Sequence, residues 1–100
     1  MVTYKGIRTC QGNRVYKDND YFSLDKSLEY ENHSPTGFNW GYGGSGPAQL
    51  ALALLLDVTN SVETAFSHYM NFKWGVVAKF SHKGFVITDT EIRKWLSRQS

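Results

Sequence analysis

The sequence predicts an α+β fold: a small, mostly antiparallel sheet with about three helices, one of which is buried at the centre. Three observations predict it. Two β-prone runs near the start flank a short connector that contains a glycine. Residues 48–56 form an almost wholly apolar stretch, and two later segments begin with residues that cap helices. A chain of 100 residues can bury a modest core, so we expect a single globular domain over residues 1–100.

The central helix is expected to follow a glycine-rich run at residues 37–46. Between Ala48 and Leu56 only Gln49 is polar, so the helix has no face suited to water. This apolar run is far shorter than the ~20 residues that span a bilayer, so burial within the protein is expected. Pro47 suits the first turn, because its missing N–H would have no partner inside the helix.

The first third of the chain is expected to form a small meander. Residues 2–9 and 13–17 are the strands of a hairpin, and a turn at 18–20 precedes a third strand at 21–24. Residues 25–36 are mostly polar and are expected to form a surface loop with at most one helical turn. The proline at position 35 favours extended or turn geometry at the end of this loop.

An amphipathic helix is expected after the buried one. Asn60 is a favourable N-cap, and Glu63 stands three residues on as the partner of a capping box. Apolar residues then recur with helical spacing. They predict a buried stripe of Val62, Ala65, Phe66, Tyr69 and Met70.

Two strands and a last helix complete the prediction. Residues 74–80 alternate with the period of a strand, and a turn at 82–84 leads to a second strand at 85–87. Thr88 and Glu91 form another capping box at the start of the last helix. The apolar stripe of that helix comprises Ile92, Trp95 and Leu96.

Composition excludes several classes of protein. The formal net charge of +2 is too small to indicate a nucleic-acid partner. Cys10 is the only cysteine, so neither a disulfide framework nor a thiolate metal cluster is expected, and a reducing compartment fits best. The start of the chain has no apolar leader, so we expect a cytoplasmic protein without a membrane partner. The spacing of His, Asp and Glu predicts no metal site and no other cofactor.

The run from Gly41 to Gly46 matches the letters G-x-G-x-x-G, and a helix begins directly after it. Free N–H groups and the positive end of the helix dipole make such a terminus attractive to anions. The dinucleotide-binding context is missing, because another helix rather than a strand is predicted next. Two interpretations stay open: contact with an anionic ligand, or glycines that serve only tight turning and close packing.

The candidate ligand-binding residues are Tyr42, Gly43, Gly44, Ser45, Gly46, Gln49 and His33. Tyr42 could stack on a base, or could hold the loop to the sheet. Gln49 is the one polar group of an apolar helix and needs hydrogen-bond partners, so it either ties down the glycine loop or reads the ligand. His33 precedes the loop, where Asp25 could orient its ring, although a solvent-exposed histidine is the simpler interpretation.

No catalytic residue can be named, so the sequence leans away from an enzyme. Ser45 lacks the context of a nucleophile elbow, and we expect it to be the N-cap of the buried helix. Trp40 is expected in the core. Three hairpin cations could converge near the loop and supply charge for phosphate, or could form a solvated face: Lys5, Arg8 and Arg14.

The stretch FNWGYGGSGPAQLALALLLD at residues 38–57 resembles the signature of a small prokaryotic family of unknown function, found also in plasmids and phages. The opening residues 4–6, the approach at 33–37 and the ending at 92–96 are similar to that family too, so the resemblance covers most of the chain. It implies a one-domain protein carried by a mobile element, and it brings no activity or site residues.

Two hypotheses follow for function. The first is a small non-enzymatic protein that binds a nucleotide or a nucleotide-derived signal at the glycine loop, in phage or plasmid counter-defence. The alternative is a protein–protein interaction module that inhibits a host defence complex, with the glycine loop purely structural. A homodimer is a common state for a domain of this size.

Overall fold

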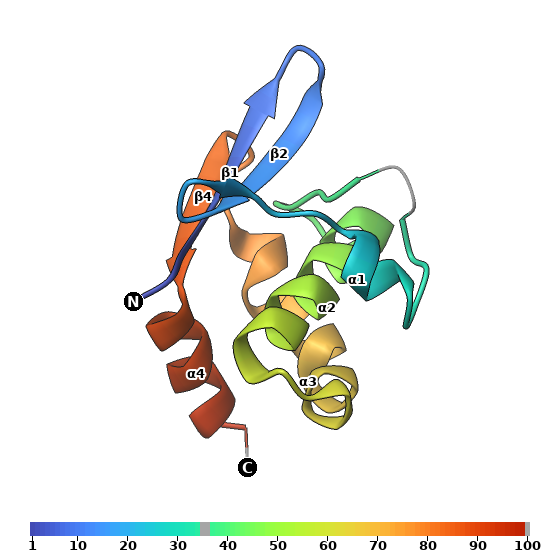
Figure 1. Ribbon diagram of the computed structural model, residues 1–100, viewed down its shortest axis with the longest axis vertical. Helices are drawn as coiled ribbons and strands as arrows, with labels where there is room; N and C mark the ends of the chain where they lie inside the picture. Colours follow the sequence, from blue (N-terminus) through green and yellow to red (C-terminus); the bar gives the residue numbers. More distant parts are fainter. Residues whose placement is uncertain (35–36, 100) are drawn as a thin grey trace.

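The computed structural model describes residues 1–34 and 37–99, so the end of the expected loop at residues 35–36 lies outside the described residues. The predicted α+β class is confirmed: a four-stranded antiparallel sheet lies beside a group of helices (Figure 1). The strand order in the sheet is β3-β2-β1-β4. The strands are β1 (Thr3–Thr9), β2 (Gly12–Lys17), β3 (Asp20–Tyr21) and β4 (Gly84–Thr88).

Strand β1 is the centre of the sheet, because it pairs with β2 on one side and with β4 on the other. Its register places Tyr4 opposite Ile87 and Gly6 opposite Phe85. A Cβ on Gly6 would lie 2.1 Å from the Phe85 ring, so this aromatic side chain requires a glycine across the ladder. The buried face of the sheet is thereby filled by Tyr4, Val15, Phe85 and Ile87.

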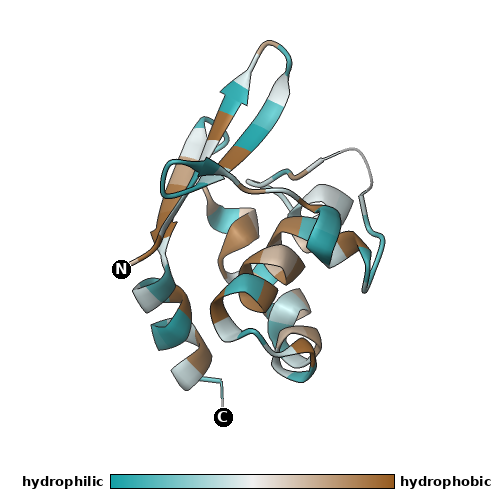
Figure 2. Ribbon diagram, in the orientation of Figure 1, coloured by the Kyte–Doolittle hydropathy of each residue, from teal (hydrophilic) through white to brown (hydrophobic). Residues whose placement is uncertain are grey.

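The helices are α1 (Asp25–Leu28), α2 (Ser45–Thr59), α3 (Val62–Gly75) and α4 (Asp89–Ser97), with a 3₁₀ turn η1 at Val77–Lys79. The predicted central helix is confirmed in α2, where residues 46–56 and Val58 are all buried. It lies between the sheet and α3, and hydrophobic residues mark much of its length (Figure 2). None of the helices in the described parts of the chain is both long and apolar enough to cross a membrane.

The junction between α2 and α3 differs by one residue from the prediction. Asn60 is not an N-cap but ends α2 in the left-handed conformation, with φ 51°, which asparagine tolerates better than most residues. Ser61 caps α3 instead, and its hydroxyl accepts a hydrogen bond from the Thr64 N–H at 3.2 Å. At the other end of the chain, the predicted Thr88–Glu91 capping box is confirmed.

The predicted strand at residues 74–80 is wrong. Helix α3 continues to Gly75 and is followed by η1, because Phe72 and Val77 are the side chains that enter the core here. The alternating apolar residues lie at the end of a helix and in a 3₁₀ turn, so the alternation does not correspond to a strand. Strand β4 therefore pairs with β1 rather than with this segment.

The third predicted strand is also shorter than expected. Strand β3 contains only two residues. The last hydrogen bond of this segment to β2 is donated by the Phe22 N–H to the Val15 carbonyl oxygen, and the chain then leaves the sheet. The Phe22 ring packs on Tyr4 and stacks on Phe38. The Phe22 side chain thus enters the core, and the edge of β2 is not paired with β3 over residues 12–14. The single helical turn expected in the following loop is α1.

The predicted apolar stripe of α3 is only half buried. Ala65 and Tyr69 face the core, but Val62, Phe66 and Met70 are exposed. The helix therefore turns a different face to α2 than the spacing of its apolar residues indicates, and it leaves apolar side chains at the surface.

Candidate ligand-binding groove

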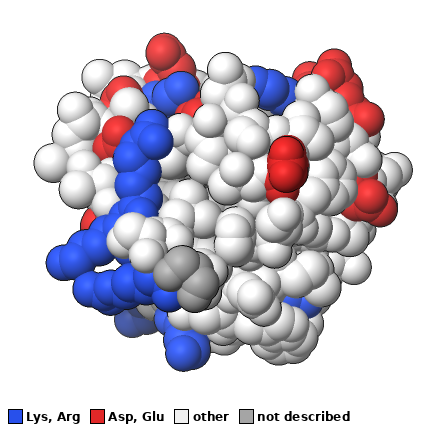
Figure 3. All heavy atoms as spheres, turned by 90° about the horizontal axis from the view of Figure 1, so that it is seen from below, with Lys and Arg blue, Asp and Glu red and all other residues white. Residues whose placement is uncertain are grey.

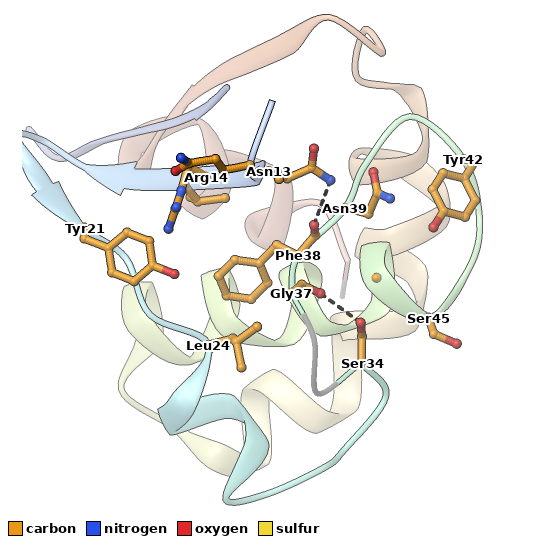
Figure 4. Close-up of a pocket in the computed structure, with 14 residues that line it drawn as sticks. Asn13, Arg14, Tyr21, Leu24, Ser34, Gly37, Phe38, Asn39, Tyr42 and Ser45 are labelled. Atoms are coloured by element: carbon orange, nitrogen blue, oxygen red, sulfur yellow. Dashed lines mark hydrogen bonds between the residues drawn. The ribbon is translucent and has the colours of Figure 1, made fainter. Parts of the chain in front are cut away.

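A groove of about 520 Å³ lies between the start of β2 and the chain that leads into α2 (Figure 4). Arg14 and Tyr21 line its sheet side, and Tyr42, Ser45 and Gly46 line its helix side. Phe38 and Leu24 lie between the two sides, together with the polar residues Asn13, Ser34 and Asn39. The open edge of β2 makes room for this groove, because β3 does not extend far enough to cover it.

The groove has a single charged side chain. Among the described residues that line it, Arg14 is the only one that carries a charge at neutral pH. The Arg14 guanidinium lies 6.0 Å from the centre of the Tyr21 ring, within the range of a cation–π contact. No carboxylate belongs to the described lining, so the groove is electrostatically suited to an anion.

The N-terminus of α2 opens at the helix side of the groove. Its N-cap is Gly44 in an extended conformation, and no side chain caps the first turn. The prediction that Ser45 is the N-cap is wrong, because Ser45 is already the first helical residue and its side chain makes no cap hydrogen bond. Within the described chain, the N–H groups of Ser45 and Gly46 have no protein acceptor, whereas the Ala48 N–H donates to the Gly44 carbonyl oxygen at 3.0 Å.

Arg8 ties the hairpin to the chain on the other side of the groove. Its Nη1 donates to the side-chain oxygens of Asn13 at 2.9 Å and Asn39 at 3.1 Å, and its Nη2 donates to the Trp40 carbonyl oxygen at 3.2 Å. The guanidinium also lies 4.6 Å from the centre of the Trp40 ring. Asn13 adds a hydrogen bond to the Phe38 carbonyl oxygen at 3.1 Å. Arg8 therefore fixes the groove wall and is not free to face a ligand.

Gln49 is buried and fully hydrogen-bonded within the protein. Its Oε1 accepts from the backbone N–H groups of His33 at 2.7 Å and Ser34 at 3.0 Å. Its Nε2 donates to the Ser27 hydroxyl at 2.8 Å and to the Glu31 carbonyl oxygen at 3.1 Å. Gln49 therefore holds the segment from α1 to residue 34 against α2. One interpretation of the sequence had Gln49 tie down the glycine loop instead, and none of these four hydrogen bonds reaches that loop.

His33 is held by the same part of the fold. Its Nε2 lies 2.9 Å from the Tyr69 hydroxyl, and the two rings pack at 5.5 Å between centres. Asp25 is not its hydrogen-bond partner, contrary to the expectation from sequence. Burial raises the pKa of Tyr69, and the nearby Glu31 carboxylate raises it further.

The glycines of the motif have structural reasons of their own. Gly41 has φ +84°, a conformation that side chains disfavour. A Cβ on Gly43 would lie 2.1 Å from the Trp74 ring, and one on Gly46 would lie 2.6 Å from the Asn39 Cβ. Tight turning and close packing therefore account for these glycines. The case for a bound ligand rests on the groove and not on the G-x-G-x-x-G pattern.

The seven candidate residues fall into three groups. Tyr42, Ser45 and Gly46 line the groove; Gly43 and Gly44 lie in the loop beside it; Gln49 and His33 are outside its lining. Sequence reasoning missed the other side of the groove, which comes from residues 11–15 and from Tyr21 and Leu24. The only prediction that concerned this side of the groove was that hairpin cations converge near the glycine loop. Arg14 does so, Arg8 supports the wall, and Lys5 pairs in the sheet with Tyr16 and Val86, away from the groove.

A second polar cluster joins the sheet to the far end of α2. The Tyr4 hydroxyl donates to Asp57 Oδ2, and the Lys17 ammonium lies 3.0 Å from the same oxygen. Burial raises the pKa of Tyr4 far above its usual value, and the hydrogen bond to the Asp57 carboxylate raises it further. Within residues 1–34 and 37–99, no group of three or more His, Cys, Asp or Glu side chains is placed to hold a metal ion.

The fold and the groove together define a small α+β protein with a polar surface groove beside a helix N-terminus. The chain belongs to the Family of unknown function (DUF6166), whose family model matches residues 4–98. Comparison with curated proteins gave no match, and comparison with solved structures gave none.

Proposed function

We propose that this chain is a small non-enzymatic binding protein whose groove takes an anionic ligand, a nucleotide or a nucleotide-derived signal. The observation that carries the proposal is the combination in one groove of Arg14, the open N-terminus of α2 and two exposed tyrosines. We propose phage or plasmid counter-defence as the setting, in which the protein would sequester such a signal.

The phosphate end of the ligand would lie at the N-terminus of α2. Ser45 is exposed and Gly46 is buried, but both line the groove, and neither N–H has an acceptor in the described chain. The helix dipole favours negative charge at this end of α2. Arg14 supplies the formal positive charge from the opposite side (Figure 4). A guanidinium is suited to phosphate because it can donate two parallel hydrogen bonds.

The base would lie against the aromatic side chains. Tyr21 is 59% exposed and Tyr42 is 45% exposed, so both rings keep a free surface. Stacking of a base on an aromatic ring contributes about 1–3 kcal/mol. The Tyr42 ring folds back over Gly44, where a Cβ would lie 2.5 Å from the ring carbon Cε2, so the glycine lets this tyrosine stand at the groove edge.

Size and chemistry both support binding without catalysis. A volume of about 520 Å³ lies within the range of ~300–1,000 Å³ that is usual for small-molecule sites. The described lining contains no His, Cys, Asp, Glu or Lys, so the groove offers neither an acid–base pair nor an activated nucleophile. The asparagines and serines along it are suited to orient a ligand by hydrogen bonds.

Calorimetric titration tests the proposal, with inorganic pyrophosphate, nucleoside mono- and diphosphates and cyclic dinucleotides as the probes. We expect at least one nucleotide to bind the wild-type protein. Arg14→Gln should weaken that binding about 10- to 100-fold, because a hydrogen bond to a charged group contributes roughly 1.5–3 kcal/mol. Arg98→Gln is the matched control, since Arg98 lies after α4 and does not line the groove, and it should bind like the wild type.

Two results would contradict the proposal. One is a folded wild-type protein that binds none of these phosphates. The other is equal affinity in the wild type and in Arg14→Gln, which would place any bound nucleotide elsewhere on the surface.

A further inference from the structure

Helix α3 exposes a continuous apolar ridge. Val62, Phe66, Met70 and Trp74 follow one another at intervals of four residues, and each is more than a third exposed. Side chains four apart are neighbours on a helix surface, so these four form one row along the helix. We call this row the α3 ridge.

The α3 ridge is separate from the face that holds α3 in the fold. The helix packs on α2 through Ala65, Tyr69 and Phe72, which are buried. Single exposed apolar side chains are ordinary on a protein surface, whereas a contiguous row of large ones marks a surface that another molecule covers. Helix α3 is thus apolar on two faces, and the chain buries one of them.

The C-terminal end of the ridge packs against the glycine run. The Trp74 ring is 57% exposed and lies against Gly43, where a Cβ would be 2.1 Å from the ring carbon Cζ3. The Lys73 ammonium lies on the ring as well, 4.2 Å from its centre. One side of the Trp74 ring therefore packs against the protein, and its exposed side can be covered by a partner.

We propose that the α3 ridge is the contact surface between two copies of this chain, with their α3 helices antiparallel. Rows of residues four apart pack into the corresponding grooves of a second helix in the commonest class of helix packing. In a two-fold dimer the same patch serves both copies, so a single ridge is sufficient for the whole contact.

The charges around the ridge match this arrangement. Glu63 is exposed in the first turn of α3, whereas Lys73 is in the last turn and Lys79 follows in η1. An antiparallel partner brings its acidic first turn to the level of the basic last turn, and it also opposes the two helix dipoles. The ridge residues themselves carry no charge that would repel a second copy. On the face of the molecule drawn in Figure 3, Lys and Arg side chains gather mostly along one side, and Asp and Glu side chains lie mostly apart from them.

Lys73 gives a second reason for a partner of this chemistry. The residue is only 6% exposed, and no carboxylate in the described chain forms an ion pair with it. The buried part is the aliphatic stem, because the ammonium group reaches the exposed Trp74 ring at the end of the ridge. In the proposed dimer, Glu63 of the second copy is the acidic group at that level.

Sedimentation equilibrium of the full chain tests the proposal. We expect a dimer for the wild type at micromolar concentrations. Met70→Glu should raise the dissociation constant at least tenfold with an unchanged circular dichroism spectrum, because Met70 is exposed at the middle of the ridge. Val86→Glu is the matched control: Val86 is 61% exposed on β4, away from α3, and its substitution should leave the dimer intact.

A charge exchange tests the antiparallel arrangement. Glu63→Lys should weaken the dimer at low salt, and the double variant Glu63→Lys with Lys73→Glu should restore it. A wild-type protein that stays monomeric at all concentrations would overturn the proposal, including the case in which the ridge captures a different protein. A dimer that survives Met70→Glu would overturn it as well. None of these measurements depends on ligand binding in the groove.

Discussion

The Trp74 ring packs directly against Gly43, which brings the end of α3 onto the glycine run that precedes α2. Gly46, three residues further along, lies equally close to Asn39. The two contacts differ in kind. The neighbour of Gly43 is an exposed side chain that can turn away, whereas the neighbours of Gly46 include the Asn39 Cβ at 2.6 Å and backbone nitrogen at 3.1 Å.

Alanine at these two glycines should therefore have unequal effects. We expect Gly46→Ala to lower the free energy of unfolding by about 1–3 kcal/mol, as overpacking against fixed atoms does. Gly43→Ala should cost less than about 1 kcal/mol, because Trp74 can move into solvent, and it should change the tryptophan fluorescence. Urea denaturation of both variants measures the difference. Equal costs would show that the Trp74 ring is as fixed as the backbone.

Gln49 should be the most sensitive polar residue of the fold. Gln49→Leu removes four hydrogen bonds and leaves the buried Ser27 hydroxyl and the part-buried backbone groups of residues 31, 33 and 34 without these partners. We expect it to lower the free energy of unfolding by at least about 3 kcal/mol, since each unsatisfied buried group costs roughly 1–3 kcal/mol. Gln11→Leu is the control, because Gln11 is exposed, and it should leave stability unchanged within about 0.5 kcal/mol. Thermal or urea unfolding checks both.

Tyr4 should make the protein sensitive to alkali. Its folded-state pKa is raised above the ordinary value of 10.0, first by burial and then by Asp57. The stabilising contribution of the protonated hydroxyl is therefore complete below pH 10 and is lost as the pH rises further, because the unfolded chain releases the proton while the folded chain retains it. The wild type should lose up to about 1.4 kcal/mol per pH unit above pH 10 that Tyr4→Phe does not lose.

The measurement is urea denaturation of both proteins between pH 8 and pH 11. The difference between the two slopes removes the contribution of the other tyrosines, which both proteins share. Parallel pH dependences would contradict a raised pKa for Tyr4.

Sequence reasoning succeeded where one local pattern decides the structure. An apolar run with a single glutamine can only be a buried helix, and the Thr88–Glu91 pair defines a helix start by its own hydrogen bonds. It failed at residues 74–80, where an apolar alternation spans the end of α3 and η1. Nothing in that pattern shows that Phe72 and Val77 take the core positions.

The groove was half predictable for a similar reason. Its helix side follows from the glycine run and the start of α2, which lie together in the sequence. Its sheet side depends on a third strand that ends after Tyr21 and leaves the edge of β2 uncovered. The length of an edge strand is set by tertiary packing, and here β3 ends because Phe22 turns into the core. No local sequence pattern predicts that end.

The hydrogen bonds of Arg8 have a consequence for any attempt to isolate or transplant the groove. They join Asn13 to Asn39 and Trp40, which are 26 and 27 positions further along the chain, and one side chain holds both walls at their spacing. A peptide or graft that carries the glycine run and α2 would reproduce the motif but only one wall. The hairpin must come with it, and so must the β1–β4 pairing that anchors the hairpin, so the smallest unit able to present this groove is nearly the entire chain.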